Sequence, residues 1–405
     1  MIYSQEFEKW IPTIKNPNIC QSCNAKFNCL FVCPSFDINY SDIIEPSKHN
    51  NHLGPIKHVY VTYSKEKQIR HSSSSGGFIR TLGKKLLENK FIDGILSLKH
   101  EKELNYRYSY FDKNMELPNS IYHSLNFEDG LNLLKEIEGK ILLIGLPCYI
   151  TSINLLFKKK KFQHLKNKIK YSIALFCGYS LDRSNVHSFG CYNKMNIKSI
   201  RYRTGGRYRK TIISDGSKTK IFDIIKPRSL SEKINNDILM DHYLVSGGCL
   251  HCMDHLGIVA DLSVGDAWLP RYNNDYEGRN LVITRNTKGE EAYSCVESSL
   301  VSENATTEDI INSQSELYAL AKLAKAINLY SSYRGKYYPN HILNSNKNNI
   351  PPLSWRIKIS INLIKQLIRK KKYKQARFLY ILINLKKYII FYVHKNFNYR
   401  SNSSQ

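Results

Sequence analysis

Hydrophobic residues in the middle of the chain recur with two different periods. In "KHVYVTYS" (57–64) apolar and polar residues alternate, which indicates a strand. In "GGFIRTLGKKLLENK" (76–90) apolar residues recur about every 3.6 positions, which indicates a helix. "KILLIGLPC" (140–148) and "KIKYSIALFC" (168–177) are nearly continuous apolar runs, typical of strands buried on both faces. We expect a further strand at 91–98 and helices at 126–139 and 149–160, so the pattern predicts an α/β core.

The pattern changes in the second half of the chain. Three short strands with polar turns between them, at 197–204, 208–215 and 217–224, predict a β-meander. The stretch "CLHCMDHLGIVADLSVGDAW" (249–268) runs from a turn into a strand, and a helical pattern occupies 287–298. The clearest break lies at "NSNKNNIPPL" (344–353).

Composition narrows the class of protein. Of the 405 residues, 42% are hydrophobic and 12% aromatic, which is enough to build cores and excludes disorder throughout. Ten cysteines are too few for a disulfide scaffold of this length, and they cluster. We find no signal peptide and no apolar run near the ~18 residues that span a bilayer. We therefore expect a protein of a reducing compartment, the cytoplasm.

The formal net charge of +26 is concentrated near the end of the chain. Residues 351–405 contain thirteen Lys or Arg and no Asp or Glu. Isoleucines at 357, 361, 364 and 368 have helical spacing, so two basic amphipathic helices are expected within 355–395. They suit peripheral contact with an anionic membrane surface at its inner face, docking on a partner, or packing back on the core. No recognition motif accompanies the charge, so we expect no nucleic acid.

Four cysteines lie within fourteen residues near the start, in "CQSCNAKFNCLFVCP" (20–34). The run consists of Cys20, Cys23, Cys29 and Cys33, and a proline follows the last of them. The run that wraps a 4Fe–4S cluster in bacterial ferredoxins also ends in Cys-Pro, but it has two residues between its second and third cysteines, where this chain has five. A zinc knuckle is the alternative, but zinc ribbons pair two Cys-x-x-Cys knuckles over a wider gap. We expect a ferredoxin-type cluster, with Cys33 able to ligate a neighbouring cluster instead.

Four more cysteines follow predicted strands or turns. Cys148 and Cys177 each end a buried strand, and Cys249 and Cys252 form a Cys-x-x-Cys pair. Ligands gather at the carboxyl edge of an α/β sheet, so these residues predict a second four-thiolate site. Cys191 and Cys295 lie in helical patterns and are expected to be packing residues.

The run "RHSSSSGGF" (70–78) precedes the helix predicted at 76–90. Serine hydroxyls, glycine amides and a helix N-terminus together suit a phosphate group. An ordinary serine N-cap after a loop is the alternative. No Gly-x-Gly-x-x-Gly or Walker loop occurs, so a dinucleotide would not be held in the Rossmann manner.

This set of motifs resembles the coenzyme F-420 hydrogenase/dehydrogenase beta-subunit family, over roughly residues 15 to 300. The resemblance rests on the first cysteine run, "SSSSGGF", "DGI" (93–95), "GLPC", "LFCG", the block at 249–268 and "NTKGEEA" (286–292). It implies a ferredoxin-type segment at 1–45, an N-terminal domain at 46–160 and a C-terminal domain at 161–345. The charge and spacing described above add a basic helical tail at 346–405. The implied fold is mixed α/β, with mixed sheets in a flavin-binding core.

The resemblance also implies two 4Fe–4S clusters and a FAD. The cofactor residues would be Ser73, Ser74, Ser75, Gly76 and Gly77, and the cluster beside the flavin would use Cys148, Cys177, Cys249 and Cys252. Two positions depart from the family pattern: "SIY" (120–122) lacks a lysine, and Tyr149 stands where glutamine is usual. Both are expected to line the flavin or substrate pocket.

The resulting hypothesis is an iron–sulfur flavoprotein oxidoreductase. A ferredoxin-like donor would supply electrons for a small organic or lipid-linked sugar substrate in surface polysaccharide synthesis. The sequence identifies no catalytic residue. Alternatives are an electron-transfer subunit without its own substrate, and a non-catalytic zinc protein with a tail that binds nucleic acid or membrane.

Overall fold

The structure is a computed structural model whose described residues all lie in the first of two compact units, 1–350 and 351–405. It describes residues 2–4, 9–11, 18, 32–34, 53–101, 104–114, 116–123, 126–181, 183–204, 210–223, 227–240, 249 and 252–315. The tail and Cys20, Cys23 and Cys29 therefore lie outside the described residues.

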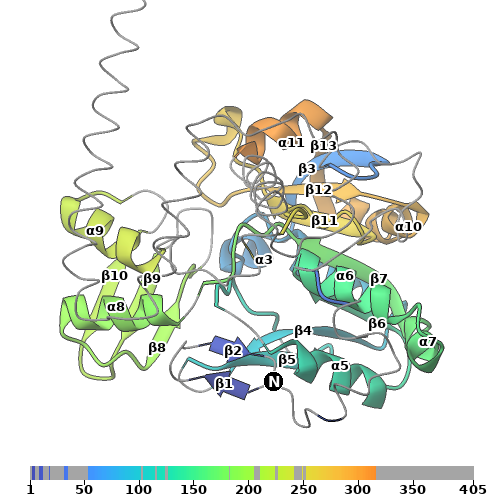
Figure 1. Ribbon diagram of the computed structural model, residues 1–405. Helices are drawn as coiled ribbons and strands as arrows, with labels where there is room; N and C mark the ends of the chain where they lie inside the picture. The colour runs from blue at the N-terminus through green and yellow to red at the C-terminus, as the bar shows by residue number, and fades with distance from the viewer. Residues whose placement is uncertain are drawn as a thin grey trace, which may run out of the picture. The chain divides into compact units, whose positions relative to one another are not determined.

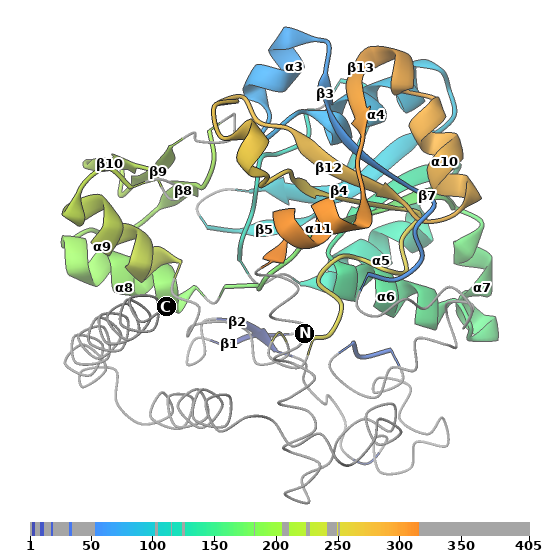
Figure 2. The same ribbon diagram turned by 90° about the horizontal axis from the view of Figure 1, so that it is seen from above.

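An eight-stranded mixed sheet forms the framework (Figures 1 and 2). Its strands, in spatial order, are β13 (Leu300–Asn304), β3 (His58–Ser64), β12 (Asn280–Thr284), β11 (Leu262–Asp266), β7 (Ile169–Leu175), β6 (Ile141–Gly145), β4 (Gly94–His100) and β5 (Tyr106–Phe111). The four strands β4, β6, β7 and β11 are parallel neighbours. The pairs at both margins are antiparallel. A short hairpin of β1 (Ile2–Ser4) and β2 (Lys9–Ile11) is separate from this sheet.

Helices cover both faces of the sheet, because successive strand residues point to opposite sides. Leu142 and Ile144 of β6 pack in one core cluster with α4 (Phe78–Glu88) and α10 (Thr287–Ser294). Ile141 and Leu143 pack in another cluster with α5 (Phe127–Glu136), α6 (Pro147–Leu156) and α7 (Lys160–Lys166). A strand buried on both faces needs the continuous apolar run seen in the sequence.

A smaller three-stranded sheet has the antiparallel order β10 (Thr219–Phe222), β9 (Thr211–Ser214), β8 (Ser199–Arg201). Helices α8 (Ser184–Asn193) and α9 (Leu230–Leu239) pack together beside it, and Phe189 of α8 stacks on Phe222 at 5.7 Å between ring centroids. The remaining elements are α3 (Lys67–Ser72), α11 (Thr307–Ser313) and two 3-10 turns, Pro270–Tyr272 and Glu297–Ser299.

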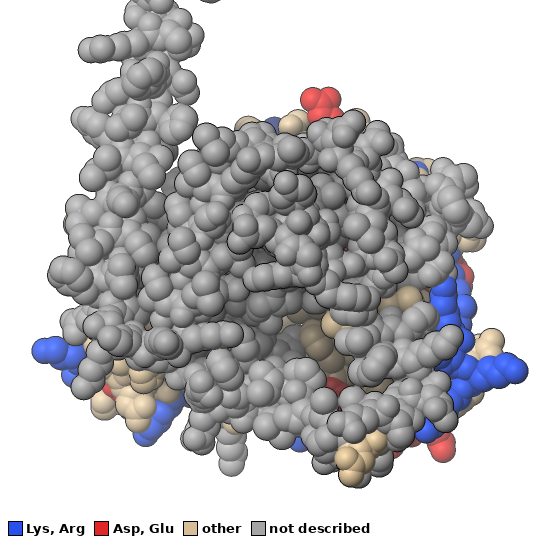
Figure 3. All heavy atoms as spheres, viewed as in Figure 1, with Lys and Arg blue, Asp and Glu red and all other residues tan. Residues whose placement is uncertain are grey.

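The predicted α/β class is confirmed, and so is the meander. Sequence patterns missed β5 and β13, the outermost strands of the large sheet. Within the described part of the chain, no helix combines the length and apolarity needed to cross a membrane. In Figure 3 the visible Lys and Arg side chains lie at the margins of the described surface.

Candidate functional site

Two of the predicted ligands come from neighbouring parallel strands. Cys148 lies in the first turn of α6, three residues after β6, and Cys177 lies two residues after β7. Strands β6 and β7 pair in parallel, with Gly145 opposite Ala174. Both thiols therefore leave the same carboxyl edge of the sheet.

The Cys-x-x-Cys segment reaches this edge through a second pairing. The Cys177 amide donates to the carbonyl of His255 at 3.0 Å, and His255 Nδ1 lies 2.7 Å from the Cys177 carbonyl oxygen. The Cys252 amide donates to the Cys249 carbonyl at 3.3 Å, which closes the turn between the two cysteines. The amide of Ser180 lies 3.3 Å from Cys249 Sγ, so it is placed to donate to that sulfur.

The four thiols are close enough to affect one another's ionisation. Each is part-buried, and burial raises the pKa of Cys148, Cys177 and Cys252 well above the ordinary thiol value. Neighbouring cysteines raise the pKa further: Cys177 and Cys249 act on Cys148, and Cys249 and Cys252 act on Cys177. In the described ranges, however, no three His, Cys, Asp or Glu side chains are spaced to ligate a single metal ion.

A buried carboxylate shapes the loop that carries the second thiol pair. Asp254 is 3% exposed, and its Oδ1 accepts from the amides of Leu256, Gly257 and Ile258 at 3.1, 2.7 and 3.2 Å. Burial raises the pKa of Asp254, and Arg285 acts in the opposite direction. The carboxylate therefore satisfies the backbone amides of the turn after Cys252, as an N-cap side chain does at the start of a helix.

Arg285 fixes the same loop from the other side. It is 2% exposed and donates from Nε to Ser263 Oγ at 2.6 Å and from Nη2 to the Leu256 carbonyl at 2.8 Å. Its Nη1 donates to the carbonyls of Leu53 and Pro55. Sequence reasoning missed both Asp254 and Arg285. For Arg285 the signal was a charged residue that closely follows the apolar run Leu281–Ile283 of β12, where a charge is rarely placed without partners.

The serine run is tied into the protein at several points. Ser73 Oγ donates to the Ile69 carbonyl at 2.7 Å and Ser75 Oγ donates to the Arg279 carbonyl at 2.9 Å, while Ser74 Oγ accepts from the Ser120 amide at 2.9 Å. Two glycines follow. A Cβ at Gly76 would meet the Thr62 carbonyl oxygen at 2.7 Å, and Gly77 has φ 86° at the N-cap of α4. Cofactor binding by Ser73–Gly77 stays a prediction.

A buried arginine joins this run to the end of β11. Arg203 is 4% exposed, its Nη1 donates to Asp266 Oδ2 at 2.7 Å, and its Nη2 donates to the Ser74 carbonyl. The pKa of Arg203 is raised because Asp266 and Tyr122 outweigh the cost of burial. This side chain is a brace between two segments, and not part of a solvated strand face. Arg201 is exposed, and Arg207 and Arg209 lie outside the described residues.

Tyr202, the residue before Arg203, belongs to a buried aromatic cluster with His123 and Tyr106. His123 is 1% exposed and shares a hydrogen bond of 2.8 Å with the Tyr202 hydroxyl, while Tyr106 stacks on its ring at 5.5 Å. Burial lowers the pKa of His123 to about 3, and Arg183 lowers it as well. Its Nδ1 has no partner among the residues that the structure describes. This imidazole is therefore neutral across the physiological range.

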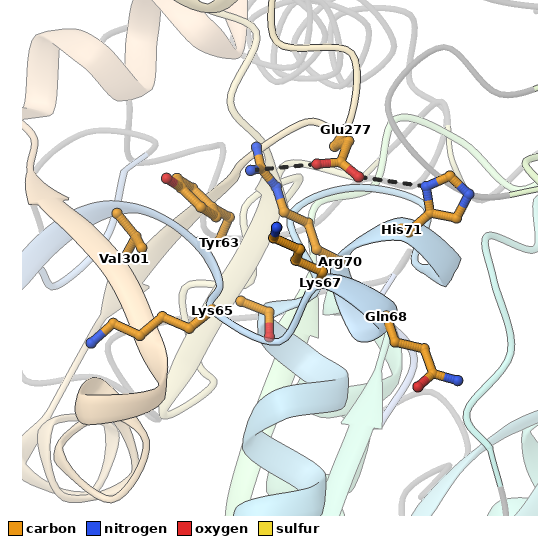
Figure 4. A pocket seen from close by; sticks show the side chains of 9 residues that line it. Tyr63, Lys65, Lys67, Gln68, Arg70, His71, Glu277 and Val301 are labelled. Atoms are coloured by element: carbon orange, nitrogen blue, oxygen red, sulfur yellow. Dashed lines mark ion pairs between the residues drawn. The ribbon is translucent and has the colours of Figure 1, made fainter.

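His71, the residue before the serines, lines an open cavity of about 600 Å³ beside α3 (Figure 4). Its Nδ1 lies 3.5 Å from Glu277, which also faces Arg70 at 3.6 Å. Both Arg70 and Arg279 lie over the ring of Tyr63, at 3.6 and 5.0 Å. The residues of the serine run are not among the cavity's lining residues.

Tyr149 does not open toward a cavity. It is 3% exposed and packs in the core cluster beneath α5, stacked on Phe127 at 5.0 Å and close to Tyr108 at 4.5 Å between centroids. A second cavity, of about 480 Å³, lies over this cluster and is lined by Tyr108 and Asp129 among others.

The fold and the four thiols define a mixed α/β protein with a cysteine-rich sheet edge. Two family models match the chain, and both describe the beta subunit of coenzyme F420 hydrogenase/dehydrogenase. The model of its N-terminal part matches residues 59–117, and the model of its C-terminal part matches residues 138–309. Together they span more than half of the sequence. The chain therefore belongs to the coenzyme F420 hydrogenase/dehydrogenase beta-subunit family.

A solved structure is similar in fold. A chain of the F420-reducing [NiFe] hydrogenase complex from Methanosarcina barkeri matches with a TM-score of 0.53 and 18% identity, over 72% of this chain and 98% of that chain. The comparison with curated proteins found no match.

Proposed function

We propose that the chain is an iron–sulfur flavoprotein oxidoreductase. Cys148, Cys177, Cys249 and Cys252 would hold one 4Fe–4S cluster, and the cysteines at 20, 23, 29 and 33 a second. The observation that carries the proposal is the convergence of four mutually interacting thiols from three segments at one sheet edge. These clusters accept and donate single electrons.

The donor set suits a cluster better than one zinc ion. A tetrahedral zinc site with Zn–S bonds of about 2.3 Å holds its sulfurs only about 3.8 Å apart. The thiols interact, yet no three of the described ligand side chains are spaced for a single ion. A cubane separates its four thiolates more widely. The amide of Ser180 near Cys249 also supplies the kind of donor that stabilises cluster sulfur.

For the flavin we propose FAD near the serine run. Bound flavin accepts two electrons and exchanges them singly with clusters. The Ser74 hydroxyl, held by the Ser120 amide, and the left-handed Gly77 before α4 are the groups we expect to face its phosphates. Arg203 would hold the Ser74 carbonyl in place.

The partner we propose is a ferredoxin-like electron carrier, and the substrate is a small organic molecule or lipid-linked sugar, as in polysaccharide synthesis. A cytoplasmic location is supported by the cysteines of the described residues, none of which forms a disulfide. An electron-transfer subunit without its own substrate is the second candidate, because the similar solved chain is part of a hydrogenase complex.

The test is to measure iron, sulfide and flavin together after anaerobic reconstitution. We expect about eight irons per chain in the wild type and about four after Cys177→Ser. The matched control is Cys295→Ser, which removes a part-buried thiol from the end of α10 and should leave iron unchanged. Stoichiometric zinc without sulfide, or equal iron in Cys177→Ser and wild type, would contradict the proposal.

A further inference from the structure

His255 and Cys177 are joined by two hydrogen bonds, one in each direction. The Cys177 amide donates to the His255 carbonyl at 3.0 Å, and Nδ1 of the His255 imidazole lies 2.7 Å from the Cys177 carbonyl oxygen. A carbonyl oxygen only accepts, so Nδ1 carries a proton and is the donor. The backbone of Cys177 is therefore held on both sides of the Cα atom that bears its thiol.

The imidazole makes this contact from a rigid part of the chain. Asp254 accepts from the three backbone amides at 256–258, and Arg285 donates to the Leu256 carbonyl. Buried charged side chains thus fix the main chain directly after His255. The residue itself is 4% exposed, so the packing around its ring keeps the ring against the Cys177 carbonyl.

The second ring nitrogen shows that packing alone does not account for a histidine here. Nε2 of His255 is buried and has no hydrogen-bond partner among the residues that the structure describes. A buried polar atom without a partner destabilises the fold, so an apolar ring would fill the same space at a lower cost. The hydrogen bond from Nδ1 is what an imidazole provides at this position and an apolar ring does not.

The loop that follows Cys177 returns to the same group of thiols. Ser180, three residues further on, places its amide 3.3 Å from Cys249 Sγ. Gly178, directly after Cys177, has no side chain that could anchor the loop. The Cys177 carbonyl belongs to the planar peptide that continues into Gly178, so a bond to this oxygen fixes the direction in which the loop leaves. The donor of one imidazole therefore holds both a thiol and the amide that faces a second sulfur.

We infer that His255 is a positioning residue for the thiol site: its Nδ1 donor fixes the Cys177 ligand and directs the Ser180 amide toward Cys249. The inference rests on the proposed function, because it takes the four thiols as the ligands of a cluster. Substituting a group that orients a metal ligand typically lowers metal affinity about 10–100-fold. The backbone bond from Cys177 to His255 remains in every variant, so we expect a cluster that assembles but is lost faster.

The experiment compares His255→Asn, His255→Gln and His255→Phe in the full chain after anaerobic reconstitution. The amide of Asn places an N–H where Nδ1 lies, the amide of Gln places it near Nε2, and Phe keeps a ring without a donor. The readout is the rate at which an excess of a ferrous chelator removes iron, and the phase absent from Cys177→Ser identifies the cluster concerned. We expect this phase to be at least about tenfold faster in the Phe and Gln variants, and His255→Asn to stay near the wild-type rate.

The order of the three variants separates this role from space filling. If His255 only fills space, the Phe variant keeps its iron longest and the Asn variant loses it fastest, and this order would overturn the inference. Wild-type rates in all three variants, or an Asn variant as fast as the Gln variant, would overturn it too. If circular dichroism shows that His255→Phe does not fold, the comparison of Asn with Gln still decides. A wild-type chain without iron, or as much iron in Cys177→Ser as in the wild type, would instead contradict the proposed function, so the two failures are distinguishable.

Discussion

Because His123 is neutral in the folded protein, it should make the free energy of unfolding depend on pH. A single substitution should remove this contribution. Because burial lowers its pKa from 6.5 to about 3, the unfolded chain binds a proton more readily than the folded one. Stability is therefore lost as the pH falls below 6.5, and the loss levels off near pH 3. Between pH 7 and pH 5 this residue should cost about 2 kcal/mol of the free energy of unfolding.

The measurement is urea unfolding of the wild type and His123→Phe at both pH values. The variant keeps an aromatic ring against Tyr106 but should lack the His123 contribution to the pH slope. It should lose about 1–3 kcal/mol at pH 7, because the Tyr202 hydroxyl loses its partner. His164→Gln, at an exposed site, should keep the wild-type slope. A slope that persists in His123→Phe would contradict the assignment.

The buried pair of Arg203 and Asp266 should behave differently from an exposed pair. Asp266→Ala leaves a guanidinium that is 4% exposed without its carboxylate, and we expect a loss of about 3–5 kcal/mol. Adding Arg203→Met should recover much of this, since no charge then remains buried. Glu66→Ala, which breaks the exposed pair with Lys84, should cost less than about 1 kcal/mol in the same thermal or urea unfolding assay. Equal losses for the two acidic residues would refute this argument.

At the scale of elements, the turn held by Asp254 should affect both the stability of the fold and the position of the Cys252 thiol. Asp254→Ala leaves three buried amides without an acceptor, so we expect a loss of about 3 kcal/mol or more in unfolding free energy. The Cys252 thiol should be displaced, and bound iron should fall by about half after reconstitution.

The control for this prediction is Asp215→Ala. Asp215 also accepts from two backbone amides, those of Ser217 and Lys218, but it lies in the exposed turn between β9 and β10. It should change stability less and leave iron content unchanged. Normal iron in Asp254→Ala would show that the turn does not hold the thiol pair in place.

Elements with a clear hydrophobic pattern were predictable from the sequence. Elements whose position depends on packing against residues far away in the chain were not. The apolar runs that became β6 and β7 gave the positions of Cys148 and Cys177 at one sheet edge. Strand β5 was missed, although Tyr106 and Tyr108 alternate with Arg107 and Ser109 as in a half-buried strand. The Tyr108 ring packs against Gly130 and Gly145, where a Cβ would meet it, and such contacts between separate parts of the chain cannot be read from local periodicity.

At the scale of the molecule, one sheet unites the two halves that the family models match separately. Strand β3, in the N-terminal match, pairs with β12 and also with β13, both from the C-terminal match. The brace from Arg203 to the serine run crosses between the same halves. Since sequence separation here exceeds 100 residues, no local pattern indicated these pairings. We expect neither half to fold when expressed alone.

Charge is also a property of the whole chain, and half of it belongs to residues 351–405. Deleting this segment lowers the formal net charge from +26 to +13. Each Lys or Arg near an anionic leaflet contributes about 1 kcal/mol of binding, and salt screens this attraction. We expect the full chain to sediment with vesicles that contain anionic lipid at low salt, and the shortened chain to remain in the supernatant with its iron intact.

Two basic runs of equal length provide the matched control. Reversing the charge of "RKKK" at 369–372 should weaken vesicle binding at least tenfold, whereas reversing "KKKK" at 158–161 should change it much less. If both reversals weaken binding equally, attraction depends on net charge and not on the tail. If the full chain binds duplex DNA more tightly than vesicles at the same salt concentration, the tail is a nucleic-acid element and the membrane prediction is wrong.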